Sequence, residues 1–204
     1  MSSPFGENEI EAFKEAGNIG AGHAAIALTK LFARDVDMSI PFVRHGNTES
    51  ILDEAKIDKD MLVAYEALSI DDPVKYKLSV FFKPQSVLSI INLLTTTKLS
   101  ELTDPSQLTK MQKSLIQEVG STIILRYIAA LNKMMRVDIV PKHAPDIKFD
   151  KAKKAFDTLF TDEGNDIFLI QLDLFTEEQK FECQLFIQPS PETIEEYRKA
   201  FYLN

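Results

Sequence analysis

The chain contains two similar halves in tandem, and this duplication constrains its fold more than any other feature of the sequence. The segment FKEAGNIGAGHAAIALTKLFARDVDMSIP (13–41) resembles IQEVGSTIILRYIAALNKMMRVDIVP (116–141). Farther along, LSVFFKPQ (78–85) resembles CQLFIQPS (183–190). Because both pairs occur in the same order and about 100 residues apart, they indicate two copies of one structural unit.

Each copy is expected to form the same succession of elements: a long helix, a short strand, a hairpin and a closing helix. Asp104–Pro105 predicts the start of the second long helix, and Ser190–Pro191 predicts the start of the last helix. Residues 146–160 carry apolar side chains at helical intervals and predict an additional short amphipathic helix. The expected elements, first copy then second, are long helices at 8–33 and 105–134, strands at 35–43 and 136–140, hairpins at 61–70 with 76–83 and at 166–174 with 180–188, and closing helices at 84–96 and 190–202.

These elements predict an α+β fold in layers. Strands joined as hairpins pair antiparallel, and amphipathic helices must bury their apolar faces on the resulting sheet. The duplication predicts an approximate internal two-fold axis. No linker rich in Gly, Ser or Pro separates the halves, about 8–100 and 105–204, so residues 1–204 are expected to form one domain.

The stretch EAGNIGAGHAA (15–25) is glycine-rich, but its pattern is not that of a nucleotide-binding loop. The glycines follow the order G-x-x-G-x-G, and no apolar strand precedes them. Gly17 and Gly20 instead fall on the apolar face of the first long helix, where they would let another backbone approach closely. Gly22 falls on the opposite stripe and leaves the surface around Asn18 uncovered. Apolar and small residues recur at three- and four-residue steps along that helix: Ile10, Phe13, Gly17, Gly20, Ala21, Ala24, Leu28 and Leu31.

Composition excludes several classes of function. The net charge of −8 argues against nucleic acid as a partner, since phosphate binding needs clustered Lys and Arg. Cys183 is the only cysteine, so an internal disulfide is excluded and no thiol-rich metal site is expected. The polar, acidic N-terminus is unlike a secretory signal, and the longest apolar runs are shorter than the ~20 residues of a bilayer span. We therefore expect a cytoplasmic protein without membrane insertion.

The segment EAFKEAGNIGAGHAAIAL (11–28) resembles the CheC-type phosphatases of bacterial and archaeal chemotaxis, the group that includes CheC, CheX and FliY. Their motif places an acidic or hydroxyl residue on a long helix, then Glu four residues later and Asn three residues after that. Here the last two are Glu15 and Asn18. Glu11 stands at the first position, where the family has Asp or Ser. The duplicated layout and the length are also similar.

This resemblance implies a hydrolase that removes the phosphoryl group from the aspartate of a CheY-type receiver. It implies catalytic roles for Glu15 and Asn18, with Asn18 positioning a water and Glu15 docking on the receiver. The second copy carries Ser114, Glu118 and Ser121 at the equivalent positions. Because serine replaces the asparagine, this second site is expected to be weak or inactive.

No cofactor or metal is expected on this chain itself. The receiver would supply a divalent metal, expected to be Mg²⁺, and a lysine that neutralises the phosphoryl group. Two alternatives stay open. One is a binding module that sequesters a CheD-type deamidase or a phosphorylated receiver, and the other is a structural relative of the middle domain of flagellar switch proteins.

Overall fold

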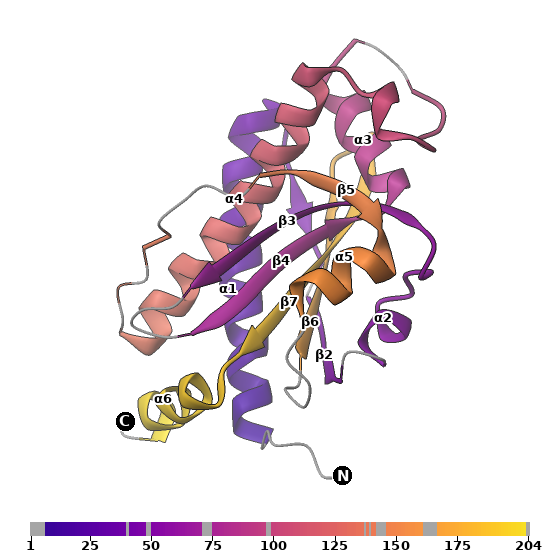
Figure 1. The fold of residues 1–204 in the computed structure, drawn as a ribbon. Coiled ribbons are helices and arrows are strands. Elements are labelled where there is room, and N and C mark those ends of the chain that lie inside the picture. Colours follow the sequence, from indigo (N-terminus) through magenta and orange to yellow (C-terminus); the bar gives the residue numbers. More distant parts are fainter. Residues whose placement is uncertain are drawn as a thin grey trace.

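A computed structural model describes residues 7–39, 41–47, 50–70, 75–96, 99–136, 138, 140–141, 146–160 and 167–202. Within these residues the chain forms helices on both faces of one mixed-length antiparallel sheet (Figure 1). The helices are α1 (Glu7–Phe32), α2 (Ile51–Glu54), α3 (Pro84–Leu94), α4 (Lys110–Met135), α5 (Ala152–Leu159) and α6 (Pro191–Tyr202). The strands are β1 (Asp37–Met38), β2 (Phe42–Gly46), β3 (Leu62–Ile70), β4 (Tyr76–Phe82), β5 (Lys148–Lys151), β6 (Ile167–Phe175) and β7 (Lys180–Pro189).

The strand order confirms the α+β class and the internal two-fold symmetry. The order is β1-β6-β7-β4-β3-β5, and β2 pairs with β6 on the same side as β1. Each half contributes one hairpin to the sheet, β3–β4 from the first half and β6–β7 from the second. The remaining strands pair with the hairpin of the other half: β1 and β2 with β6, and β5 with β3. At the centre, Val80 of β4 pairs with Leu185 of β7. These two residues are equivalent in the similar segments 78–85 and 183–190, so the symmetry axis passes between them.

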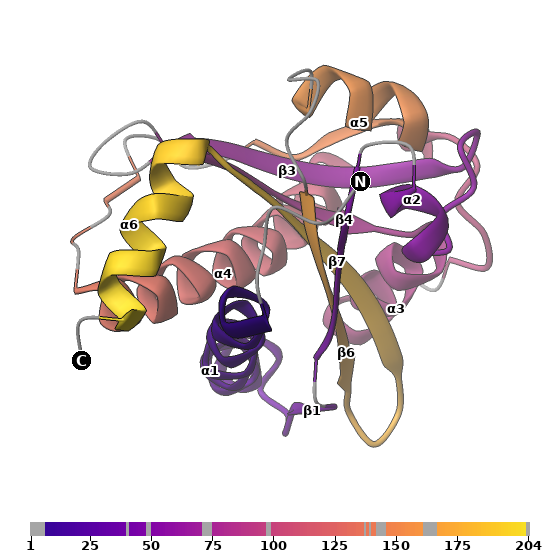
Figure 2. The ribbon, with the colours of Figure 1, turned by 90° about the horizontal axis from the view of Figure 1, so that it is seen from below.

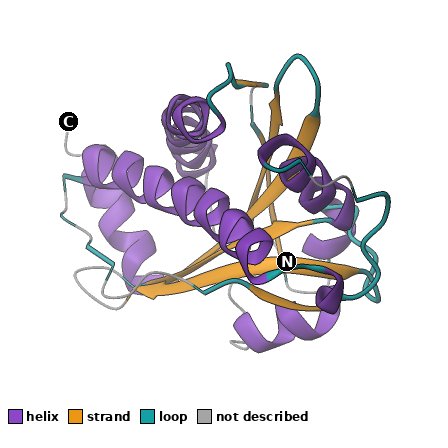
Figure 3. Ribbon diagram, turned by 90° about the horizontal axis from the view of Figure 1, so that it is seen from above, coloured by secondary structure: helices purple, strands orange, loops and turns teal. Residues whose placement is uncertain are grey.

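The two faces of the sheet carry different helices (Figure 2). The antiparallel pair α1 and α4 lies on one face together with α3 and α6, and Figure 3 shows the two long helices inclined to each other. The larger apolar core fills the space between these helices and the sheet. On the opposite face α2 and α5 cover a smaller, phenylalanine-rich core. The outer surface of α1 and α4 is therefore the broad helical surface of the protein.

Both predicted hairpins and both closing helices are confirmed, but the predictions for the second copy need two corrections. Asp104–Pro105 begins a 3₁₀ turn (Pro105–Gln107) and not the long helix. The helix begins after Thr109, whose hydroxyl accepts from the backbone N–H of Gln112 while the Gln112 side chain accepts from the backbone N–H of Thr109. This reciprocal capping box satisfies two N–H groups that a helix start leaves unpaired.

The predicted strand at 136–140 is wrong for the residues that the structure describes there. Arg136 ends α4 in the left-handed conformation, with φ of 56°, and residues 138 and 140 lie outside any strand. Residues 137 and 139 lie outside the described residues. The edge strand of this half is β5 instead, which pairs with β3 as β2 pairs with β6. The predicted helix at 146–160 is thus confirmed only in its second part, α5. In the first half, the strand predicted at 35–43 is divided between β1 and β2.

Helix α4 has the length and composition of a membrane span over Lys110–Met134. Half of its most apolar window is buried within the fold, against α1 and the sheet. A buried core helix meets the same criterion, so this feature is weak support for a span.

The α1–α4 contact explains one of the helix glycines and predicts a contrast in stability. A Cβ on Gly20 would lie 3.0 Å from Tyr127 Cα in the α4 backbone, whereas a Cβ on Gly22 would meet nothing within 4 Å. Alanine favours helix over glycine by ~1 kcal/mol, and overpacking costs roughly 1–3 kcal/mol. We expect Gly22→Ala to raise the free energy of unfolding by up to about 1 kcal/mol and Gly20→Ala to lower it by about 1 kcal/mol. Urea denaturation of the two variants checks this, and equal stabilities would contradict the close contact.

Candidate functional site

Glu15 and Asn18 lie one helical turn apart on the outward face of α1, and both are exposed. Residues between and beside them, including Phe13, Ala16 and Gly17, are buried on the opposite face. Neither the Glu15 carboxylate nor the Asn18 carboxamide forms a hydrogen bond or ion pair with any residue that the structure describes. Both polar groups are thus exposed and unengaged within the described part of the chain, as the predicted helix face requires.

The surroundings of Asn18 leave it accessible. Beneath it, α1 packs closely on the sheet, because a Cβ on Gly17 would lie only 3.4 Å from the Ile170 side chain. Ile170 offers no polar partner that could draw the carboxamide inward. Side chains of a helix lean toward its N-terminus, so the residue four positions later covers a given site. For Asn18 that residue is Gly22, which has no side chain.

Glu11, the first residue of the motif, does not take part in this arrangement. Its carboxylate pairs with Lys14 in an exposed i,i+3 contact. Exposed pairs of this kind contribute ~0.2–0.5 kcal/mol to a helix. Glu11 thus serves the local stability of α1.

The equivalent residues of the second copy are arranged differently. Glu118 is exposed on α4, like Glu15 on α1. Ser114 donates its hydroxyl to the backbone carbonyl of Lys110, within its own helix. Ser121 donates inward, to Glu66 Oε2 on β3 at 2.8 Å. The serine at the position equivalent to Asn18 is therefore engaged with the core of the protein.

Glu66 is the reason for this difference, and sequence analysis missed it. Its side chain is completely buried, and Oε1 has no hydrogen-bond partner among the residues that the structure describes. Only glycine at position 120 leaves room for the carboxyl group, since a Cβ there would lie 2.3 Å from Glu66 Oε1. Glu66 pairs with Val80 as Ile170 pairs with Leu185, so a carboxyl group under α4 replaces the isoleucine that lies under α1. The single acidic residue in the apolar strand LVAYEALSI was the available signal.

Burial raises the pKa of Glu66 to about 8, and the nearby carboxylates of Glu118 and Asp146 act in the same direction. The hydrogen bond from Ser121 opposes this increase. The buried carboxyl is consequently protonated over most of the neutral pH range, because the uncharged form avoids the cost of placing an anion in the core.

Leu125 provides a second difference between the halves. It occupies on α4 the position that Gly22 occupies on α1, and the residue is 45% exposed. By the same lean of helical side chains, Leu125 covers the surface above Ser121. The position of Ser121 therefore differs from that of Asn18 in two ways: its hydroxyl points inward, and a leucine covers it.

A groove of about 430 Å³ runs between α1 and α4, beside the Glu118 side of this surface. It combines two cationic side chains, one carboxylate and exposed apolar surface. Its lining consists of His23, Ile26, Ala27, Lys30 and Leu31 of α1 with Glu118, Thr122 and Arg126 of α4. The groove therefore joins the two halves of the helical surface.

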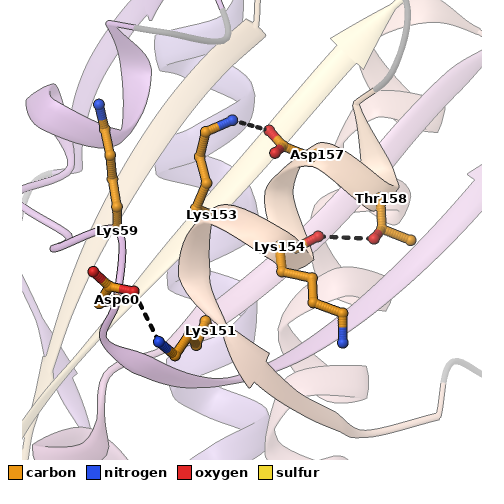
Figure 4. Close-up of a pocket in the computed structure, with 7 residues that line it drawn as sticks. All are labelled: Lys59, Asp60, Lys151, Lys153, Lys154, Asp157 and Thr158. Atoms are coloured by element: carbon orange, nitrogen blue, oxygen red, sulfur yellow. Dashed lines mark hydrogen bonds and ion pairs between the residues drawn. The ribbon is translucent and has the colours of Figure 1, made fainter.

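A second hollow, of about 420 Å³, lies on the opposite face of the sheet beside α5 (Figure 4). Two of its lysines are paired with aspartates that also line it, with Lys151 Nζ 2.9 Å from Asp60 Oδ1 and Lys153 paired with Asp157. These exposed pairs satisfy their own charges. Among the described residues, no three His, Cys, Asp or Glu side chains gather as a metal ion would need.

Comparison with known proteins identifies one that is similar to this chain in sequence. The chain is 24% identical over 147 residues to the CheY-P phosphatase CheC of Bacillus subtilis strain 168, which covers 71% of this chain and 68% of the relative. A scan against protein-family models gives no match. The chain is a relative of the CheC-type proteins.

Solved structures extend the likeness of fold to FliY and FliM proteins. FliY of Thermotoga maritima superposes with a TM-score of 0.73 at 15% identity over 98% of each chain. A chain of the FliG–FliM complex from H. pylori gives a TM-score of 0.69 at 10% identity, over 95% of this chain and 98% of that chain. The layered α+β fold predicted from the duplicated sequence is thus shared with these structures across nearly the whole chain.

Proposed function

We propose that this CheC-type protein accelerates hydrolysis of the phosphoaspartate of a CheY-type receiver. The observation that carries the proposal is the pair Glu15 and Asn18, exposed side by side on α1 without partners among the described residues, with no side chain at Gly22 to cover them. The sequence relation to a CheY-P phosphatase supports the same chemistry. An outward pair on a rigid helix can enter the active site of another protein.

In this mechanism Asn18 holds the attacking water. A carboxamide accepts a hydrogen bond from water through its oxygen and donates through its nitrogen, but it is no strong base. Its contribution is therefore orientation. The water oxygen forms the new bond to phosphorus, and the bond from phosphorus to the aspartate oxygen breaks. Inorganic phosphate and the free aspartate carboxylate are the products.

The receiver supplies the remaining groups. Its divalent metal, expected to be Mg²⁺, and its lysine would neutralise charge on the transferring phosphoryl group. Glu15, three residues from Asn18, lies ~5–6 Å from it at the Cβ level and is positioned to pair with that lysine. No cofactor on this chain is required. A phosphorylated receiver is the partner, and the cytoplasm is the expected location.

The proposal is tested by following phosphate release from phosphorylated CheY-type receivers with and without the wild-type protein. We expect faster loss of phosphate at catalytic amounts of the protein. Absence of acceleration with every cognate receiver would contradict the phosphatase function.

A non-catalytic binding module is the second candidate. The likeness to a chain of the FliG–FliM complex favours it, because the same fold there occurs in a protein assembly. A CheD-type deamidase or a phosphorylated receiver would be the bound protein. The same assay distinguishes the two candidates, because a binding module would slow hydrolysis of the receiver's phosphoaspartate or leave its rate unchanged.

A prediction about the second copy tests whether the serine at position 121 alone, or also its neighbours Glu66 and Leu125, makes this position inactive. Ser121→Asn alone is expected to add no activity, because the new carboxamide can donate to buried Glu66 and lies beneath Leu125. Adding Leu125→Gly and Glu66→Ile reproduces the surroundings of Asn18. We expect activity of the second copy only in this triple variant, measured in an Asn18→Ala background. A gain with Ser121→Asn alone would show that neither neighbour matters.

A further inference from the structure

The groove between α1 and α4 carries charged side chains that no described residue pairs with. Lys30, Arg126 and Glu118 form no hydrogen bond or ion pair with any part of the chain that the structure describes. Ile26, at the same groove, is 63% exposed. The two cations exceed the single carboxylate on a chain whose net charge is −8. The groove is thus locally cationic and partly apolar, which complements an acidic surface with an apolar side chain.

The groove lies within reach of anything bound at Asn18. Asn18 precedes Gly20 by two residues, Ser121 precedes Tyr127 by six, and Gly20 contacts Tyr127 between antiparallel helices. At 1.5 Å rise per residue, Asn18 and Ser121 are separated by about 12 Å along the helices. With ~8–10 Å between the axes, the two positions lie roughly 15 Å apart.

This spacing limits how many proteins can bind at once. A specific interface covers ~800 Å² on each partner, which corresponds to a disc with a radius of roughly 16 Å. A protein of this size that is centred between Asn18 and Ser121 would cover both positions and the groove as far as Lys30, which lies about 18 Å from Asn18 along α1. Two partners of this size could not bind at the two positions together.

We propose that a single receiver spans α1 and α4, with its phosphoaspartate at Asn18 and an acidic, partly apolar segment of its surface in the groove. This inference rests on the proposed function and names the docking surface that accompanies it. The second copy then contributes binding and not catalysis. The inward direction of Ser121 is compatible with this role, because Glu118, Thr122 and Arg126 form the α4 wall of the groove and binding needs no reactive group at position 121.

The decisive variant is the charge reversal Lys30→Glu/Arg126→Glu. The control is Lys59→Glu, an exposed lysine on the opposite face whose side chain also has no partner among the described residues (Figure 4). Binding is measured by titration calorimetry with the receiver loaded with beryllium trifluoride, which mimics the phosphoryl group. Steady-state phosphate release is measured with the phosphorylated receiver.

We expect one receiver per chain for the wild type. The double variant is expected to raise Kd and KM by about 10-fold or more while kcat changes less than about twofold, and Lys59→Glu is expected to change each value less than twofold. Two receivers per chain, or an unchanged Kd and KM in the double variant, would overturn the inference. If the wild type does not accelerate phosphate release but binds one receiver per chain, and the charge reversal weakens that binding, the phosphatase function is wrong and the docking surface stands. If the wild type accelerates phosphate release and the charge reversal leaves Kd and KM unchanged, the phosphatase function stands and the docking surface is wrong.

Discussion

Asn18→Ala is expected to lower kcat for receiver dephosphorylation by about 100-fold, with KM changed less than about threefold. Removal of one group that positions a reacting atom commonly costs ~10²–10³ in kcat, and 100-fold corresponds to about 2.7 kcal/mol. The change should appear in kcat because the water is fixed most firmly in the transition state, not in the docked complex. Stability should be nearly unaffected, since the Asn18 side chain is exposed.

Glu15→Ala provides the contrasting kinetic effect. Its carboxylate is exposed and is proposed to pair with a receiver lysine, and exposed ion pairs contribute ~0.2–1 kcal/mol. A two- to fivefold increase in KM with a smaller change in kcat is the expected result. Glu11→Ala, on the same helix but paired with Lys14, is the matched control and should change neither value appreciably. If Asn18→Ala kept wild-type kcat while Glu11→Ala lost it, the proposed site would be wrong.

The elements predicted correctly are those whose signals are local. The hairpin strands β3 and β6 are short, mostly apolar runs beside turn-forming segments. Helix α1 repeats its apolar and glycine positions over seven turns, so in both cases the signal lies in neighbouring residues. Strand β5 was missed because KFDK carries no apolar alternation. It is a strand only because it pairs with β3 at the edge of the sheet, which is a tertiary contact.

The site shows the same division. The outward direction of Glu15 and Asn18 follows from helical periodicity, which the sequence contains. The inward direction of Ser121 depends on Glu66, 55 residues away in the chain. An acidic residue in a strand normally indicates a solvent-facing position, and only the packing of Gly120 against β3 reverses that expectation.

Glu66→Gln is expected to abolish most of the pH dependence of stability between about pH 4.5 and 8. In the wild type, burial raises the folded-state pKa of Glu66 to about 8, from 4.5 for the free side chain. The folded chain therefore binds more protons than the unfolded chain over this interval. The contribution of Glu66 to the free energy of unfolding is therefore greatest below pH 4.5, and it decreases as the pH rises toward 8. At ~1.4 kcal/mol per pKa unit, the loss is on the order of 2–5 kcal/mol.

The glutamine variant separates the charge of Glu66 from its hydrogen bond. Its carboxamide oxygen can still accept from Ser121, and its volume matches that of the acid, so only ionisation is removed. Urea denaturation at pH 5.5 and 8.5 should give a wild type that weakens at the higher pH and a variant that is then the more stable protein. Glu101→Gln, at an exposed carboxylate, should follow the wild type. If Glu66→Gln also followed it, the carboxyl group would have to reach water in the folded state, and Ser121 would no longer be held by a buried partner. The second position could then turn outward, and the distinction between one catalytic half and one docking half would disappear.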